Sequence, residues 1–261
     1  MRTAFFLIAM QDDEHPPIAG TNHQKRRAII IGGTSGIGRA LATTMHDAGY
    51  LVAVTGRRKE LLQSLSDELH QEIFIHEMDV SHIEDARSIL KQLIVELGGV
   101  EIIVLDAGAG HSWPTFEEDM EMVRVNCAGF VGLADIALET FVKQGYGHLV
   151  GISSVMGERG MYVATTYSAT KAFISHYLQG IQHRMKRERL PVYITDIRPG
   201  FVLTPMTASN GYMFWAIDAQ KAARLILRAI QARRSVAYIP ERWRLVAWIM
   251  RVVPRWVGAW V

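Results

Sequence analysis

RAIIIGGTSGIGRAL, residues 27–41, is the stretch of sequence that decides the fold. It starts with an apolar run typical of a buried strand, turns at Gly32, Gly36 and Gly38, and continues as a helix. Glycines let the backbone approach a pyrophosphate closely, and the helix N-terminus adds N–H donors and a partial positive charge. Because the turn joins a strand to a helix, we interpret it as a nucleotide-binding turn and not as a purely structural one.

The same alternation of short apolar runs and longer amphipathic segments continues along the chain. The predicted strands are apolar throughout, and not only at every second position, which indicates a parallel sheet covered by helices on both faces. The sequence therefore predicts a doubly wound α/β fold. Its predicted strands are residues 27–33, 50–57, 72–80, 100–108, 147–155 and 191–200, and its predicted helices are 37–49, 59–70, 84–99, 116–144 and the segment around 167–171.

Composition is that of one globular domain. The 261 residues are 49% hydrophobic and 21% charged, and the net charge of +2 is too small to predict nucleic-acid binding. Cys127 is the single cysteine of the sequence, so neither a disulfide framework nor a cysteine-based metal site is expected. One free thiol fits a reducing compartment, and we expect a cytoplasmic protein without a metal ion.

Both ends of the chain differ from its centre. The apolar run at residues 3–10 is too short for a signal peptide or a membrane span, and Pro16 and Pro17 follow it, so residues 1–27 are expected to form an irregular arm. The predicted domain covers residues 28–240. Residues 241–261 form a tail rich in tryptophan and arginine.

TTYSATKAF, residues 165–173, places Tyr167 and Lys171 four residues apart in a predicted helix, where both side chains share one face. An ammonium beside a phenol favours the phenolate and lowers the tyrosine pKa, as a general acid and base would need. Taken alone, the pattern also fits an ordinary half-exposed Tyr and a solvated Lys.

Four features in order, the glycine turn, Ser154 thirteen residues before Tyr167, the Tyr167–Lys171 pair and RPG at residues 198–200, identify a resemblance. Over about residues 28–240 the chain resembles the short-chain dehydrogenase/reductase family in its compact single-domain form. The resemblance implies a Rossmann fold, an NAD(P)-dependent reaction between a ketone and a secondary alcohol, and a homodimer or homotetramer.

The resemblance also assigns catalytic roles. Tyr167 would be the general acid in reduction and the base in oxidation, and Lys171 would support it and bind the nicotinamide ribose. Ser154 would donate to the substrate oxygen, and Asn126 in VRVNCAG would hold a water in the proton path. A buried asparagine that satisfies backbone groups is the alternative for Asn126, and the two interpretations are compatible.

Cofactor contacts implied by the resemblance fall along the carboxyl ends of the predicted strands. For Asp79, a cap of the strand end is an equally good interpretation. The residues concerned are Gly32, Thr34, Ser35, Gly36, Ile37, Gly38, Asp79, Val80, Ala107, Gly108, Tyr167, Lys171, Pro199, Gly200, Val202 and Thr204.

Three positions depart from the family pattern. Where the family has Asn-Asn-Ala-Gly, this chain has Leu105 and Asp106 before Ala107, and an ionised Asp cannot donate the hydrogen bonds of an Asn. Ile31 stands where the family has a threonine before the first glycine. His111 lies near the expected substrate entrance, where we favour a solvated loop histidine over a substrate contact.

AVTGRRKE, residues 53–60, indicates the cofactor. An enzyme that selects NAD places an acid at the end of this strand, but the position is Gly56, and Arg57 and Arg58 follow it. Guanidinium groups bind phosphates through charge-assisted hydrogen bonds, so the sequence predicts NADPH. If both arginines are merely solvated, the missing acid predicts dual specificity. Arg39 begins a helix and is expected to point elsewhere.

Large apolar side chains follow the RPG turn: Met206, Tyr212, Met213, Phe214 and Trp215. They predict a mobile, hydrophobic lid over the substrate, with a buried core loop as the alternative. We therefore expect a hydrophobic carbonyl or alcohol substrate.

The tail combines tryptophans and arginines as segments at a lipid interface do. It is too short to span, so it is expected to lie on a membrane surface or a partner subunit; a helix over the protein's own core or a dimer seam is the alternative. The residues are Trp243, Trp248, Trp256, Trp260, Arg242, Arg244, Arg251 and Arg255.

Two other functions compete with a ketone reductase. A non-catalytic dinucleotide-binding regulator would keep the fold, but the four catalytic candidates argue against it. A sugar-nucleotide epimerase or dehydratase can share the Tyr-Lys spacing, but usually has a longer C-terminal domain and a different glycine spacing.

Overall fold

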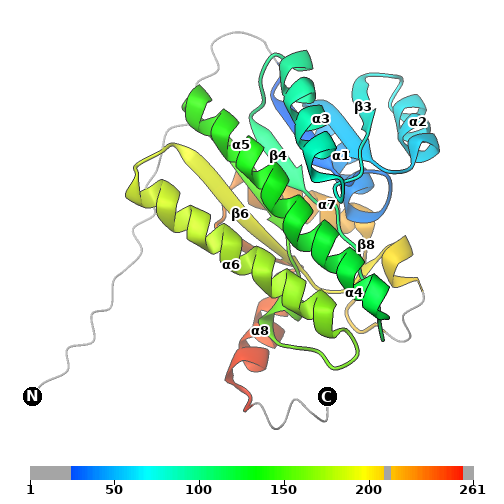
Figure 1. Cartoon of the computed structure of the whole chain (residues 1–261), viewed down its shortest axis with the longest axis vertical. Coiled ribbons are helices and arrows are strands. Elements are labelled where there is room, and N and C mark those ends of the chain that lie inside the picture. Colours follow the sequence, from blue (N-terminus) through cyan, green and yellow to red (C-terminus); the bar gives the residue numbers. More distant parts are fainter. Residues whose placement is uncertain (1–24, 209–212, 255–261) are drawn as a thin grey trace, which may run out of the picture.

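The computed structural model describes residues 25–208 and 213–254 of the chain, which Figure 1 shows coloured along its sequence. Apart from residues 25–27, the predicted N-terminal arm lies outside the described residues, as does Tyr212 of the predicted lid. The first strand begins at Arg27.

Seven parallel strands form the central sheet, in the order β3-β2-β1-β4-β5-β6-β9. All six predicted strands are present, and the doubly wound parallel sheet is confirmed. The bounds are β1 (Arg27–Ile31), β2 (Leu51–Gly56), β3 (Ile73–Glu77), β4 (Ile102–Leu105), β5 (Gly147–Ile152), β6 (Val192–Pro199) and β9 (Val236–Ile239).

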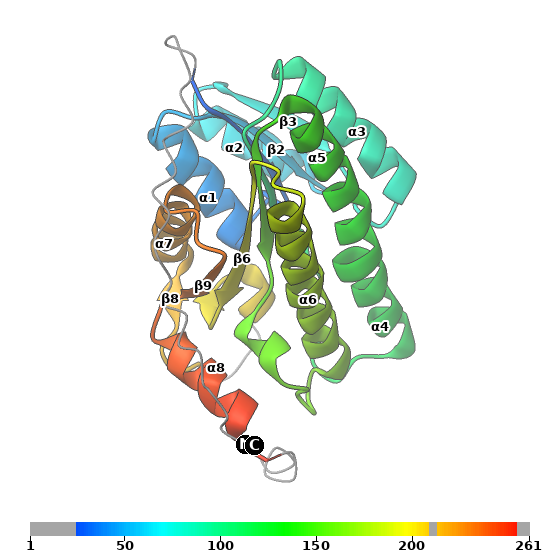
Figure 2. The ribbon, with the colours of Figure 1, turned by 90° about the vertical axis from the view of Figure 1, so that its left-hand side faces the viewer.

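Helices cover both faces of this sheet, as Figure 2 shows from the side. On one face lie α3 (Ile83–Glu96), α5 (Phe130–Gln144) and α6 (Thr165–Arg187), and on the other lie α1 (Gly36–Asp47), α2 (Lys59–Glu68) and α7 (Ala219–Gln231). In β1, Ile29 and Ile31 join the first core while Ala28 and Ile30 join the second. Both faces of the strand are buried, which is why it is apolar throughout.

One long helical segment leads from the region of the site back along the sheet. It consists of α4 (Phe116–Met122), the π-helical segment η1 (Val123–Gly129) and α5. Thr115 starts it with a capping box to Glu118. The segment is long and apolar enough to cross a membrane, with a mean hydropathy of 1.5, but 56% of its most apolar window is buried inside the protein.

Short elements gather beyond the carboxyl ends of the strands. They are η2 (Val155–Glu158), β7 (Val202–Leu203), η3 (Pro205–Thr207), β8 (Ile217–Asp218) and α8 (Trp243–Val252), which projects from this end of the molecule in Figure 1. The sequence analysis missed β7, β8 and β9 because runs of two to four residues are too short for hydrophobic periodicity to show.

Candidate active site

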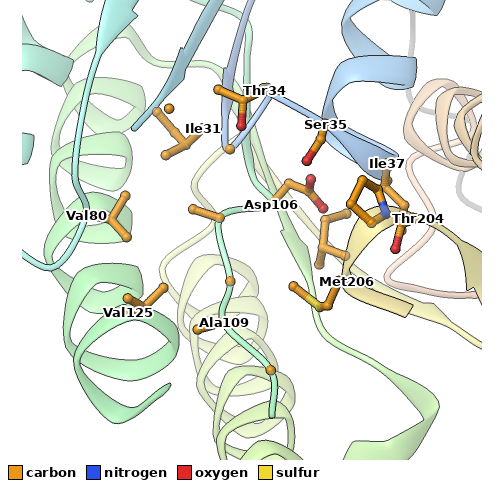
Figure 3. Close-up of a pocket in the computed structure, with 18 of the residues that line it drawn as sticks. Ile31, Thr34, Ser35, Ile37, Val80, Asp106, Ala109, Val125, Thr204 and Met206 are labelled. Carbon is orange, nitrogen blue, oxygen red and sulfur yellow. The ribbon is translucent and has the colours of Figure 1, made fainter. Parts of the chain in front are cut away.

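A cavity of about 560 Å³ opens where the strands β1, β4, β5 and β6 end (Figure 3). This size lies within the usual range of small-molecule sites. Every predicted cofactor or catalytic residue lines it except Gly38 and Asn126, which lie behind the lining. Residues far apart in the sequence thus meet at the edge of the sheet where an open α/β fold binds its ligands.

The glycine turn forms the nucleotide half of the cavity. Gly32 has a φ of +101°, and a Cβ there would lie 2.5 Å from the Ala107 backbone nitrogen. Gly38, in the first turn of α1, packs just as closely, because a Cβ there would lie 2.5 Å from the Gly32 carbonyl oxygen. The first N–H groups of α1 therefore lie against the end of β4, where larger side chains would hold the segments apart.

The two arginines after β2 make different contacts. Arg58 Nη2 donates to Thr34 Oγ1 at 2.8 Å and to Ser35 Oγ at 2.7 Å, so its guanidinium lies over the glycine turn. Arg57 Nη1 instead lies 3.4 Å from Glu121 Oε1 on α4. Arg39 points away, as predicted, and pairs with Glu68 at 2.7 Å.

Asp79 caps the end of its strand and also lies at the cavity, so it fits both interpretations of its role. Its Oδ1 accepts from the Ser81 backbone N–H at 2.9 Å and from Ser81 Oγ at 2.7 Å, so it caps the turn after β3. Burial raises its pKa, but these two hydrogen bonds and the charge of Arg57 outweigh burial and leave the pKa lowered. Asp79 and Val80 also line the cavity.

Tyr167, Ser154 and Lys171 meet in the other half of the cavity. Ser154 lines the cavity together with Tyr167, and its Oγ accepts from the Met156 backbone N–H at 3.1 Å. Lys171 Nζ donates to the Ile152 carbonyl oxygen at 2.9 Å and lies 5.6 Å from the centre of the Tyr167 ring. The neighbouring Ser153 points into the protein, where it donates to the Asp196 carboxylate. Ser154 is therefore the serine that faces the tyrosine.

The expected lowering of the tyrosine pKa is not what the structure shows. Burial raises the pKa of Tyr167 to about 12, the Ser154 hydroxyl opposes this, and the charge of Asp106 adds to it. Lys171 is itself buried, which lowers its pKa to about 8 against the attraction of Asp106 and Asp196. Because desolvation is the largest effect on its pKa, Tyr167 is a phenol throughout the neutral range.

Asp106 is the site residue that departs most from the family pattern. It projects among the residues of the cavity in Figure 3, with Gly38 N–H as a hydrogen-bond partner. Its deep position raises the carboxyl pKa to about 7, although the charge of Lys171 and the Gly38 hydrogen bond oppose the rise. The sequence predicted that Asp106 cannot donate the hydrogen bonds that the family's asparagine donates. Its raised pKa beside Lys171 was not predicted.

Asn126 is fully buried in η1, behind the cavity. Its Nδ2 donates to the Ala109 carbonyl oxygen at 2.8 Å and to Thr170 Oγ1 at 3.0 Å, and its Oδ1 accepts from the Ala109 N–H at 2.8 Å. These are the contacts of a buried asparagine that satisfies backbone groups. A role in holding a water stays a prediction.

The predicted lid residues and His111 meet the cavity to different extents. Met206 is exposed and lines the cavity, whereas Phe214 and Trp215 do not line it and pack on Trp243. His111 Nδ1 lies 3.3 Å from Glu118 Oε1, and its Nε2 lies 3.4 Å from Glu121 Oε2. His111 lines the cavity, is 33% exposed and lies beside two carboxylates of α4, so the choice between a solvated histidine and a substrate contact stays a prediction.

Several lining residues were not assigned by sequence reasoning. Glu121 and Val125 come from the helix that follows β4, and no motif marks them. Gly110 was missed although a Cβ there would lie 3.0 Å from Tyr167 Cε2, so a glycine makes room for the ring. Within residues 25–208 and 213–254, no group of three or more His, Cys, Asp or Glu side chains is arranged to hold a metal ion.

Comparisons with known proteins agree on one family. Residues 26–213 match the family described as short chain dehydrogenase. An uncharacterized oxidoreductase of Staphylococcus aureus is 32% identical over 215 residues, which are 80% of this chain and 92% of the relative.

Two solved structures share the fold. The closed form of a serine dehydrogenase complexed with NADP+ has a TM-score of 0.69 and 24% identity, over 78% of this chain and 88% of that one. A short chain dehydrogenase/reductase from Burkholderia phymatum in complex with NAD has a TM-score of 0.79 and 18% identity, over 86% of this chain and 92% of that one.

Proposed function

The chain belongs to the short-chain dehydrogenase family of oxidoreductases, and we propose that it reduces a hydrophobic ketone or aldehyde with NADPH. The observation that carries the proposal is that Ser154, Tyr167 and Lys171 face one cavity whose other half is the glycine turn with Arg58. One half provides groups for proton transfer, and the other provides donors for phosphates.

The nucleotide half fits a dinucleotide by the chemistry of its donors. The first N–H groups of α1, the hydroxyls of Thr34 and Ser35 and the Arg58 guanidinium surround one part of the cavity. Such donors bind phosphate oxygens. When bound there, a nicotinamide dinucleotide would supply the hydride that the carbonyl carbon accepts.

The catalytic residues have distinct roles in this proposal. Ser154 donates a hydrogen bond to the carbonyl oxygen and fixes its position. Tyr167 transfers its phenolic proton to that oxygen as negative charge develops. Its high pKa keeps this proton in place at neutral pH, so the tyrosine is in the acid form that reduction requires. Lys171 places a buried cation beside the ring and stabilises the phenolate that remains.

Arg58 is the main support for the preference for NADPH. It lies over Thr34 and Ser35, and the acid that would repel a 2′-phosphate is replaced by Gly56. Arg57 is less suited, because Glu121 neutralises part of its charge. We therefore assign the 2′-phosphate to Arg58 and a smaller, long-range contribution to Arg57.

The exposed Met206 side chain, which lines the cavity, supports a hydrophobic substrate. A panel of apolar ketones and aldehydes, with serine and NADP+ as the polar comparison, tests this through cofactor absorbance. We expect kcat/KM for the best apolar carbonyl to exceed that for serine at least about tenfold, the equivalent of burying two methylenes. A preference for serine would show that the substrate class is wrong while leaving an oxidoreductase.

The same measurements separate the competing functions. A regulatory protein would bind NADPH in a fluorescence titration but turn over no member of the panel. An epimerase or dehydratase would convert a sugar nucleotide without net change in cofactor absorbance. Net oxidation of NADPH with an equal amount of alcohol formed is expected here.

A further inference from the structure

Helix α8 presents an apolar stripe to solvent. Leu245, Trp248, Ile249 and Val252 are 58%, 60%, 44% and 56% exposed. Their spacing places them on one face of the helix. Figures 1 and 2 show α8 outside the layers of the sheet and its covering helices, at the end of the molecule where the strands terminate. The stripe is therefore not part of the core of this chain.

The opposite face anchors the helix firmly. Trp243 and Ala247 are buried, and the Trp243 ring lies 4.9 Å from the ring of Phe214 and 5.5 Å from that of Phe201. Arg159 Nη1 donates to the carbonyl oxygens of Met250 at 2.9 Å and Val253 at 2.7 Å. The tail thus partly covers the domain, which agrees with the alternative prediction of a helix over the protein's own core. The exposed stripe belongs to a helix that is held in place.

Cations flank the stripe on both sides. At 100° per residue, Arg244 and Arg251 lie along one border, and Arg242, whose backbone is already helical, lies along the other. The ten residues of the helix, WRLVAWIMRV, include no acid. Glu158 and Asp196 together balance Arg198 and Arg251, and Glu241 lies 3.6 Å from Arg244. The excess positive charge of this surface therefore comes from Arg242 and from Arg159, which donates to a carbonyl oxygen of α8.

We propose that this stripe binds the surface of an anionic lipid membrane. An apolar face bordered by arginines, with tryptophan among its apolar residues, is suited to burial at the boundary between headgroups and acyl chains. The arginines complement lipid phosphates. The sequence beyond the described residues, RWVGAWV at 255–261, adds one cation, two tryptophans and no acid. Ten residues of helix lie on a bilayer and do not span it.

A second copy of the chain is the less suitable occupant. Two copies docked stripe to stripe would bring the arginines of one helix against those of the other. Four side chains on a ten-residue helix are also far fewer than the roughly 20 residues that each partner contributes to a stable interface. The proposal does not depend on the proposed function, because neither the stripe nor its charges belong to the catalytic residues.

Vesicle flotation of the full chain tests the proposal. Vesicles of phosphatidylcholine are compared with vesicles that also contain phosphatidylglycerol, for wild type, Leu245→Ser/Trp248→Ser and Arg244→Glu. We expect wild type to float with the anionic vesicles, and the double variant to bind at least about tenfold more weakly because two large side chains lose their burial. Arg244→Glu should bind the anionic vesicles more weakly than wild type, and its binding to vesicles of phosphatidylcholine should not change.

Val95→Ser is the matched control, since Val95 is 78% exposed on α3, at the other end of the molecule. It should float as wild type does, and all variants should keep the wild-type melting temperature. Equal partitioning of wild type and the double variant, or no flotation of wild type, would overturn the proposal. Loss of a dimer in light scattering, without any flotation, would assign the stripe to a second copy.

Discussion

The two halves of the cavity are built by different physical means. The nucleotide half uses backbone N–H groups, hydroxyls and arginines that reach solvent, with Arg57 57% exposed. The catalytic half uses titratable groups deeper in the cavity: Lys171 is buried, Tyr167 and Asp106 are half-buried, and desolvation is the largest cause of all three pKa shifts. Charges in the first half can change without disturbing the core. Any change in the second alters proton equilibria, and with them the dependence of stability on pH.

Tyr167→Phe should have the largest effect, and it should affect turnover without affecting cofactor binding. It removes the transferable proton but keeps the ring, so kcat should fall by about 10²- to 10⁴-fold, the usual contribution of a general acid. The dissociation constant for NADPH, measured by fluorescence titration, should stay close to that of wild type. Ordinary turnover in this variant would show that the tyrosine is not the proton donor. Equal losses in turnover and binding would show that the two halves are not independent.

Arg58→Ala should have the next largest effect, confined to the nucleotide half. A charge-assisted hydrogen bond contributes roughly 1.5–3 kcal/mol, so affinity for NADPH should fall about ten- to a hundredfold. Affinity for NADH should change little, because NADH has no 2′-phosphate. Both dissociation constants are measured by titration.

Arg57→Ala is the control for this prediction. Its guanidinium is partly neutralised by Glu121, so we expect a smaller loss of NADPH affinity than for Arg58→Ala. If the two variants rank in the opposite order, the 2′-phosphate contacts Arg57. If wild type binds NADH as tightly as NADPH, the preference for NADPH is wrong.

Asp106→Asn should give the smallest effect, on stability in the catalytic half. The folded-state pKa of Asp106 is raised from 3.8 to about 7, so folding favours the protonated carboxyl, and stability is lost as pH rises from about 4 to 7. Asparagine does not titrate and can still accept from Gly38 N–H. We expect the melting temperature of the variant to exceed that of wild type by about 2–5 °C at pH 7.5, and by less at pH 5.

The titration of Lys171 limits the pH range in which the two proteins can be compared. Its folded-state pKa is lowered from 10.5 to about 8, so stability of the wild type is lost as pH falls from about 10.5 to 8. The charge of Asp106 opposes this lowering, so the Lys171 pKa is lower still in the variant, and melting curves at pH 5 and pH 7.5 report on the coupled pair. A variant less stable than wild type at pH 7.5 would show that attraction between Asp106 and Lys171 exceeds the cost of burying the carboxylate.

The features that could be predicted are those that depend on short stretches of sequence. The six central strands and the glycine turn follow from apolar runs and glycine spacing, and Tyr167 with Lys171 from helical periodicity. The contrast between Arg57 and Arg58 was beyond the sequence, because it depends on Glu121, which α4 brings across the cavity. The high pKa of Tyr167 was missed for a related reason, since burial is a property of the assembled fold.

The tail illustrates a second limit. Its tryptophans and arginines predicted a surface or a core helix, and α8 turns out to be anchored on one side and exposed on the other. Composition alone does not show which tryptophans are buried and which are exposed. Only the packing of Trp243 on Phe201 and Phe214 fixes which face Trp248 presents.

The π-helical segment η1 widens the turns of the long helix. In a π-helix each hydrogen bond spans five residues and not four, so the chain accommodates extra length without ending the helix. Because these wider turns absorb about one residue, α4 and α5 keep nearly the same rotational relation, whereas a regular α-helix through the same residues would turn α4 by about 100° relative to α5. Asn126 could then no longer bond both Ala109 and Thr170 while α5 kept its contacts with the sheet. The surplus residue therefore acts as a spacer, which lets α4, Asn126 and α5 all keep their contacts along one continuous helix.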